Sequence, residues 1–156
     1  MVETILAALL IGGLILAFAA TVLLVLRRRS KSTNLLSARR RFQLRREWLE
    51  AKFFTLASES GSPRGLEWVD VEFDDAVKFA RDRKNGNLRA LVGVTIRFRA
   101  VEGGPMEGNP NVENPKAATA VFYLDGEEWS TKGRTVFNLN PTQAIQHFKQ
   151  ELELVE

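Results

Sequence analysis

Residues 4–26 form an uninterrupted run of 23 uncharged, mostly apolar side chains, which limits the possible folds more than any other feature. As an α-helix the run would measure about 34 Å, enough to cross the roughly 30 Å hydrocarbon core of a bilayer. A cleavable signal peptide is disfavoured, because its positive charge precedes a shorter apolar region that ends at small residues. The sequence therefore predicts a transmembrane helix over 4–26, after an outside tail of residues 1–3.

The basic residues lie on one side of this run. Residues 1–3 contain no Lys or Arg, whereas residues 27–46 contain nine and no acidic residue. Cytoplasmic flanks of membrane helices are enriched in Lys and Arg, so we expect the N-terminus outside and the remainder in the cytoplasm. The absence of cysteine agrees with a reducing compartment. The predicted location is the inner (cytoplasmic) membrane of a cell, crossed once.

Charge is also divided within the part that follows the run. We read residues 27–36 as a basic juxtamembrane linker and 37–156 as a soluble domain, because residues 47–156 contain 13 basic and 18 acidic side chains. Anionic lipid headgroups attract such a basic cluster. Nucleic acid is disfavoured as a partner, because no aromatic residue that could stack on bases is interleaved before Phe42. The residues assigned to the membrane surface are Arg27, Arg28, Arg29, Lys31, Arg39, Arg40 and Arg41.

Small residues within the apolar run could bring two membrane helices together. Gly13 and Ala17 are four positions apart, a spacing that lets helix backbones approach closely. Gly and Ala are also common in membrane helices that do not associate, and this second interpretation is the favoured one because the motif is short.

A second helix is predicted over residues 37–58. Its apolar stripe is formed by Phe42, Leu49, Phe53 and Leu56 and is widened by Leu44, Trp48 and Phe54. The first four recur at steps of seven, four and three, which is one helical face. Such a stripe covers a sheet more often than it binds a partner. Turn and breaker residues at 58–63 end the helix.

Alternating patterns after this helix predict five β-strands: 66–73, 77–81, 88–101, 117–124 and 129–139. Asn85-Gly86 and Asp125-Gly126 indicate two tight hairpins. In 88–101, seven apolar residues of one parity indicate a single buried face. The predicted fold class is therefore α+β. Behind the membrane helix we expect a helix, a curved five-strand antiparallel meander and a C-terminal helix.

Three local signals refine this order. Gly133 indicates a bulge in the last strand. Asn140 as N-cap with Pro141 after it predicts the start of the terminal helix, which the apolar spacing extends to Val155. Residues 102–116 contain three prolines and three glycines, and we expect this long connection to be mobile rather than functional.

The reactive side chains do not form a recognised catalytic motif. The chain has no cysteine and one histidine, His147, which excludes Cys/His zinc sites. Carboxylates cluster in residues 67–75 and could bind a hard cation, but they lack the spacing of a calcium loop, so we read them as a solvated strand end. Gly103-Gly104 precedes a proline rather than a phosphate-binding helix. We expect no enzyme activity, no cofactor and no metal.

The element order over residues 37–156 resembles the α+β cone of the nuclear transport factor 2-like and cystatin-like superfolds. Segments 63–68 (PRGLEW) and 137–145 (FNLNPTQAI) resemble parts of uncharacterised single-pass bacterial membrane proteins, a likeness that implies no mechanism. A ligand-binding protein of the cone type would need a pocket between helix 37–58 and the sheet. The candidate lining residues of this pocket are Phe42, Leu49, Trp68, Val94, Phe98 and Phe122.

Three functional interpretations follow from these patterns, of which the least favoured is an RNA- or DNA-associated protein that uses the arginines of residues 39–46. The favoured one is a membrane-anchored, non-catalytic cytoplasmic module that binds a protein partner or a second copy of itself. The alternative is a small-molecule binder or enzyme that uses the cone-shaped pocket.

Overall fold

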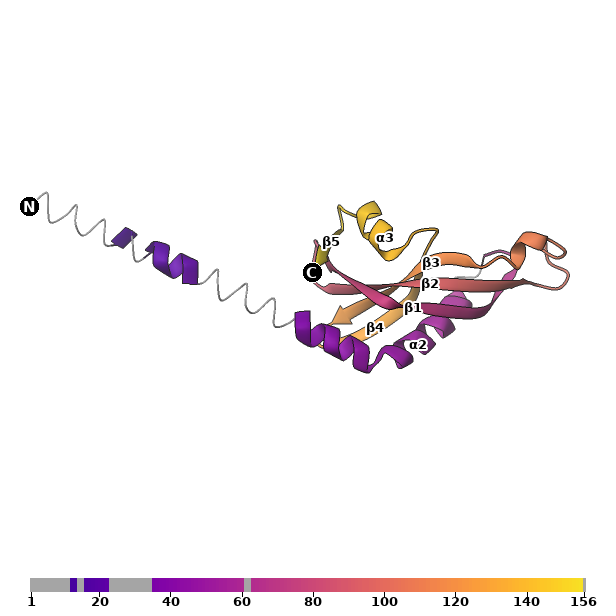
Figure 1. Cartoon of the computed structure of the whole chain (residues 1–156), viewed down its shortest axis with the longest axis horizontal. Helices are drawn as coiled ribbons and strands as arrows, with labels where there is room; N and C mark the ends of the chain where they lie inside the picture. Colours follow the sequence, from indigo (N-terminus) through magenta and orange to yellow (C-terminus); the bar gives the residue numbers. More distant parts are fainter. Residues whose placement is uncertain (1–11, 14–15, 23–34, 61–62, 156) are drawn as a thin grey trace, which may run out of the picture. The chain divides into compact units, whose positions relative to one another are not determined.

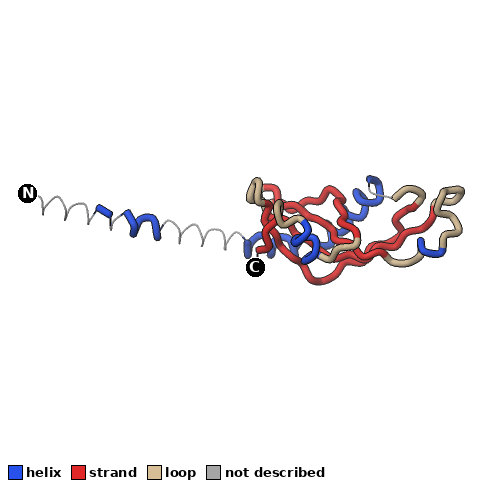
Figure 2. The backbone as a smooth tube through the Cα atoms, turned by 90° about the horizontal axis from the view of Figure 1, so that it is seen from above, coloured by secondary structure: helices blue, strands red, loops and turns tan. Residues whose placement is uncertain are grey.

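The computed structural model describes residues 12–13, 16–22, 35–60 and 63–155 (Figure 1, Figure 2). The chain divides into two compact units, residues 1–40 and 41–156. The elements of the second unit are helix α2 (Arg46–Ser60), strands β1 (Leu66–Asp82) and β2 (Leu88–Ala100), the 3₁₀ helix η1 (Pro110–Val112), strands β3 (Lys116–Asp125) and β4 (Glu128–Phe137), helix α3 (Pro141–His147) and strand β5 (Leu152–Val155).

The first unit contains the predicted transmembrane helix, of which only 12–13 and 16–22 are described. Both stretches are helical, and the Thr21 hydroxyl donates a hydrogen bond to the Phe18 carbonyl oxygen at 2.7 Å. The rest of the predicted span 4–26 and most of the predicted linker 27–36 lie outside the described residues. Within the part of the chain that the structure describes, no helix is both long enough and apolar enough to cross a membrane. The membrane helix stays a prediction.

The second unit is built on a five-strand antiparallel sheet in the order β4-β3-β2-β1-β5. The predicted α+β class and the curved five-strand sheet are confirmed. One hairpin joins β1 to β2 through residues 83–87, and a second joins β3 to β4 through Gly126 and Glu127. Gly86 and Gly126 have φ angles of 76° and 58°. Glycine adopts these left-handed angles without a steric penalty, which is why both turns fall close to their predicted positions.

The C-terminal part differs from the prediction. Helix α3 begins as predicted, with the Asn140 side chain accepting a hydrogen bond from the Gln143 amide, but it ends at His147. The chain then forms β5, which pairs with residues 79–82 of β1. The prediction of a helix reaching Val155 is wrong, because β5 pairs with backbone groups at the edge of β1. Tertiary pairing of this kind overrides a weak helical spacing.

The sequence predicted two strands, 66–73 and 77–81, where the structure has the single strand β1. The prediction differs because a bulge interrupts the strand. Its register against β2 shifts across residues 74–76. The Arg46 guanidinium, at the start of α2, donates hydrogen bonds to the carbonyl oxygens of Asp74 and Asp75, the latter at 2.8 Å. The Nε of Arg46 also lies 2.6 Å from a carboxylate oxygen of Glu50. Arg46 therefore satisfies backbone acceptors that the bulge removes from the ladder and holds α2 against β1.

Helix α2 and the helical residues 41–44 before it place most of the predicted apolar stripe on one face of the sheet (Figure 1). Three residues of this stripe, Phe42, Leu49 and Phe53, are fully buried. The Phe42 ring packs edge to face against three others, at centroid distances of 5.9, 5.4 and 5.1 Å: Phe79, Phe122 and Trp129. This geometry is favourable for aromatic pairs, so Phe42 lies at the centre of an aromatic core.

The predicted bulge at Gly133 is present, because the register of β3 against β4 shifts opposite this residue. Gly133 has a φ of 71°. A Cβ atom built on it would lie 2.6 Å from the Ala57 amide nitrogen of α2. The missing side chain therefore lets the α2 backbone approach β4 closely.

Helix α3 covers the opposite face of the sheet at one end (Figure 1). A second core cluster lies there: Ala80, Leu91, Ala144, Ile145 and Leu152. The expectation that strand 88–101 buries only one face is wrong at Leu91, because α3 and β5 cover that side.

Asp82, the register partner of Leu152, holds a largely buried ion pair with Arg89. The Asp82 carboxylate also accepts a hydrogen bond from the Lys84 amide at 2.8 Å. Arg89 in turn lies over the Tyr123 ring, 5.5 Å from its centroid. The Lys84 amide and the Arg89 charge together lower the pKa of Asp82, against the opposing effect of burial.

Replacing Asp82 by Asn is expected to lower the free energy of unfolding at neutral pH by about 1–3 kcal/mol, because the Arg89 guanidinium loses its partner. Folding lowers the pKa of Asp82, so its contribution is present above the ordinary value of 3.8 and is lost as the pH falls through the lowered pKa. Urea unfolding of the full chain in detergent at successively lower pH measures both effects. The wild-type and Asp82→Asn curves should converge in acid, and a constant difference would contradict the assignment.

Candidate functional site

The six predicted pocket residues come together on the α2 face of the sheet, where they form packed core. All six are buried: Phe42, Leu49, Trp68, Val94, Phe98 and Phe122. The rings of Trp68 and Phe98 lie 5.3 Å apart, and the Phe53 ring lies 6.4 Å from Trp68 and 5.8 Å from Phe122. Of the three surface grooves described below, one includes Phe98 and none includes the other five.

Four predicted membrane-surface residues lie outside the described part of the chain: Arg27, Arg28, Arg29 and Lys31. Arg39 and Arg40 are helical residues of the first unit, and Arg41 opens the second unit. The predicted helix-association residues Gly13 and Ala17 are helical and exposed. Their roles stay predictions.

Three carboxylates of the acidic cluster in β1 pair with arginines of β2. Arg97 lies 3.6 Å from Asp70 and 2.9 Å from Glu72, and Arg99 lies 2.6 Å from Glu67. Exposed cross-strand pairs of this kind contribute little stability, but they neutralise one another. Among the described residues, no group of three His, Cys, Asp or Glu side chains is placed to hold a metal ion.

The structure differs most from the predicted apolar stripe at Arg45, where the helix is interrupted. The Arg45 amide donates to the Phe42 carbonyl oxygen at 3.1 Å, a bond typical of a helix end, and α2 begins at the next residue. Leu44 and Trp48 were predicted to widen the stripe, but they are 77% and 53% exposed. At about 100° per residue, both positions lie on the side of the helix away from Phe42. The prediction counted apolar residues without applying this angle.

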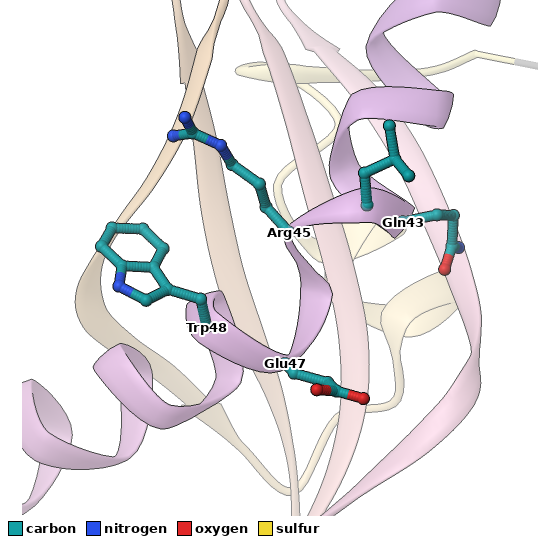
Figure 3. A pocket seen from close by; sticks show the side chains of 5 residues that line it. Gln43, Arg45, Glu47 and Trp48 are labelled. Atoms are coloured by element: carbon teal, nitrogen blue, oxygen red, sulfur yellow. The ribbon is translucent and has the colours of Figure 1, made fainter.

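A surface hollow opens at this break (Figure 3). It encloses about 790 Å³ and is lined by Gln43, Leu44, Arg45, Glu47 and Trp48, and we name it the bend hollow. Arg45 and Trp48 project from one side of the helical turn, whereas Gln43 and Glu47 project from the other. The lining of the hollow thus combines an aromatic ring and a guanidinium with an amide and a carboxylate.

Cations lie close to the apolar part of the bend hollow. The Nζ of Lys52 lies 4.8 Å above the Trp48 ring, within range of a cation–π interaction. Arg45 lies 4.0 Å from Glu128, and both side chains are more than half exposed, so this ion pair is weak. An adjoining groove shares two residues with the hollow and adds four others: Arg41, Glu127, Glu128 and Trp129.

A third groove is lined by the end of β2 and by residues of loop 102–116. This loop lies at the other end of the sheet (Figure 1). The groove encloses about 530 Å³, and we name it the distal groove. Its lining includes Phe98, Arg99, Asn109, Val112 and Glu113. Val112 is buried, and the Asn109 side chain accepts a hydrogen bond from the Asn111 amide at 3.0 Å. These contacts fold part of the loop into a defined wall, while the predicted mobility of the loop stays a prediction.

No protein-family model matches the sequence, and neither a curated protein nor a solved structure matches it. The functional argument therefore depends on the residues and on their geometry.

Proposed function

We propose that this chain is a membrane-anchored, non-catalytic interaction module, held in the cytoplasmic membrane by residues 4–26 with its soluble domain in the cytoplasm. The observation that carries this proposal is the bend hollow, whose lining includes the exposed apolar side chains of Leu44 and Trp48 together with Arg45. Apolar side chains that gather on a surface mark a binding site, whereas scattered ones need no explanation.

The first 46 residues support the location. The 23-residue apolar run has the length of a membrane helix, and the nine basic residues of 27–46 follow it directly. The charge asymmetry favours a cytoplasmic domain. Anionic headgroups of the inner leaflet would attract the same basic residues.

The charged side chains of the domain support a binding role. Arg46 pairs with Glu50, Asp82 pairs with Arg89, and Arg97 pairs with acids of β1. Glu47 lines the bend hollow and Glu113 lines the distal groove, so these two acids face a possible ligand, whereas the paired charges do not. The distal groove, whose lining combines apolar residues such as Phe98 and Val112 with polar ones such as Asn109, offers a surface for a protein partner or a second copy of the chain.

A small-molecule binder or enzyme of the cone type is the alternative function. It needs a cavity between the 37–58 helix and the sheet. At that place the rings of Phe42, Phe53 and Trp68 pack against their neighbours, which favours the interaction module.

Protease protection on sealed membranes tests the anchor and its orientation. Trypsin should digest the domain in inverted vesicles, at exposed turn residues such as Arg83 and Lys84, and spare it in right-side-out vesicles. Carbonate washing should leave the chain in the membrane fraction. A matched variant replaces Arg27, Arg28 and Arg29 by Glu and places Lys at positions 2 and 3, and its orientation should invert. Release by carbonate, or digestion in right-side-out vesicles, would contradict the proposal.

Cross-linking tests the interaction role separately. A photoreactive amino acid at Asn109, in the distal groove, should trap either a second copy or one defined partner protein in intact membranes. The same probe at Lys132, on an exposed part of β4, serves as the control. A chain that is monomeric in mild detergent and cross-links to nothing specific from Asn109 would argue against this role.

A further inference from the structure

We infer that the bend hollow is a second membrane contact: it binds anionic phospholipid headgroups, and Leu44 and Trp48 enter the interfacial layer beside them. The inference rests on the proposed function, because it needs the domain at the surface of the membrane that holds the anchor. The proposed ligand of the hollow is the phosphate diester of a lipid headgroup, together with the first part of the apolar chains beside it.

The two apolar side chains of the bend hollow suit the interfacial layer. Trp is enriched where a membrane meets water, because its ring is apolar and its N–H group can still donate a hydrogen bond. Trp68 and Trp129 are only 8% and 2% exposed. Trp48 is therefore the tryptophan that is exposed on the surface of the domain, and exposed Leu44 lines the same hollow.

The cations beside these side chains suit a phosphate. A guanidinium can donate two parallel hydrogen bonds to a phosphate group. Arg45 lines the hollow itself. Its side chain lies 4.0 Å from that of Glu128, and both side chains are more than half exposed. This pair can exchange for a headgroup at little cost. Arg41 lines the adjoining groove, and Lys52 lies over Trp48.

Three acidic side chains lie close enough to oppose an anion: Glu47, Glu127 and Glu128. The cations beside the hollow, Arg41, Arg45 and Lys52, equal these acids in number, so the excess of positive charge comes from the basic residues that precede the hollow in the chain. The acids therefore weaken the contact without reversing its sign. They also provide a test, since removing their charge should strengthen it.

Chain continuity favours the membrane over a free partner as the occupant. Residues 27–43 join the predicted membrane helix directly to the bend hollow and carry most of the basic cluster. A tether converts a weak contact into an intramolecular one at high effective concentration. Each basic residue near an anionic surface strengthens binding by about fivefold.

Tryptophan quenching in the full chain, reconstituted into vesicles, tests the inference. The vesicles consist of phosphatidylcholine with or without phosphatidylglycerol, and some of the lipids carry brominated acyl chains as quenchers. We expect bromolipid quenching only when phosphatidylglycerol is present. The quenching should disappear in Trp48→Phe, where the buried Trp68 and Trp129 remain and report that the domain is folded.

Charge variants add a second measurement. The double variant Arg45→Gln/Lys52→Gln should lower the equilibrium constant for contact between the hollow and the lipid surface, measured by Trp48 quenching, by about fivefold for each charge. The double variant Glu127→Gln/Glu128→Gln should raise it. Added salt should weaken the contact, because the exposed charges are screened.

Each contrary result has a distinct meaning. Equal quenching without phosphatidylglycerol, or quenching that survives Trp48→Phe, would overturn the inference. A chain that resists carbonate but shows no quenching would overturn it while leaving the anchor intact. A chain that fails to enter the vesicles would contradict the proposed function itself. Trp48 that is shielded from acrylamide but not quenched by bromolipid would point to a protein on the bend hollow instead.

Discussion

The Gly133→Ala variant is expected to lose about 2–5 kcal/mol of unfolding free energy. Two costs add at this position. The φ of 71° places an alanine in the left-handed region, which costs about 1–2 kcal/mol. The new Cβ would also lie 2.6 Å from the Ala57 amide nitrogen, so α2 would have to move away from β4. Urea unfolding of the full chain in detergent, followed by tryptophan fluorescence, measures the loss.

Gly126→Ala is the matched control for this prediction. Gly126 also has a positive φ, 58°, but no atom lies within 4 Å of a Cβ built on it. This variant should lose only the backbone cost of about 1–2 kcal/mol. The difference between the two variants isolates the close approach of α2 to β4. Equal losses would show that this approach does not exist.

The Phe42→Ala variant should lose about 3–5 kcal/mol, the usual cost of emptying a buried aromatic site. Phe42 is fully buried and touches three other rings. Its neighbours come from three strands, so they cannot all move in to fill the space. The expected readouts are a lower urea midpoint and a red-shifted emission of Trp129, whose ring lies 5.1 Å away.

Leu44→Ala provides the comparison, two residues along the same helix. Leu44 is 77% exposed, so its truncation should change the unfolding free energy by no more than about 0.5 kcal/mol. A large loss of unfolding free energy for Leu44→Ala together with a small one for Phe42→Ala would mean that the buried and exposed sides of the helix are assigned the wrong way round.

Local chemistry made several elements predictable from the sequence. Gly86 and Gly126 mark turns because their φ angles suit glycine. Asn140 marks the start of α3 because its side chain accepts from the Gln143 amide. The alternation in β2 predicted the strand because residues of one parity face the aromatic core. Each of these signals lies within a few residues of the structure that it specifies.

The errors arose where the structure depends on contacts distant in sequence. Strand β5 exists because the edge of β1 offers it partners some 70 residues away, as in the Phe79–Val155 pair. The β1 bulge depends on Arg46, from a different element. Leu91 is buried because α3 covers a face that alternation alone assigned to solvent.

The candidate site was only partly accessible to sequence reasoning. The basic cluster and its position after the apolar run were clear from the sequence. The bend hollow was missed, although the helical angle between Phe42 and Trp48 could have placed Trp48 on the outer side. The break at Arg45 and the neighbouring acids of the β3–β4 turn follow from tertiary structure.

The unequal covering of β2 has a consequence for how the domain fluctuates. Near Leu91 both faces of the strand are covered, whereas near Arg97 and Arg99 one face is open to water. Hydrogen bonds in the doubly covered half should break only when the whole domain unfolds, while those in the other half can break by local opening. The distal groove borders the half that can open. Its walls can therefore adjust their shape to a bound molecule while the α3 end stays rigid.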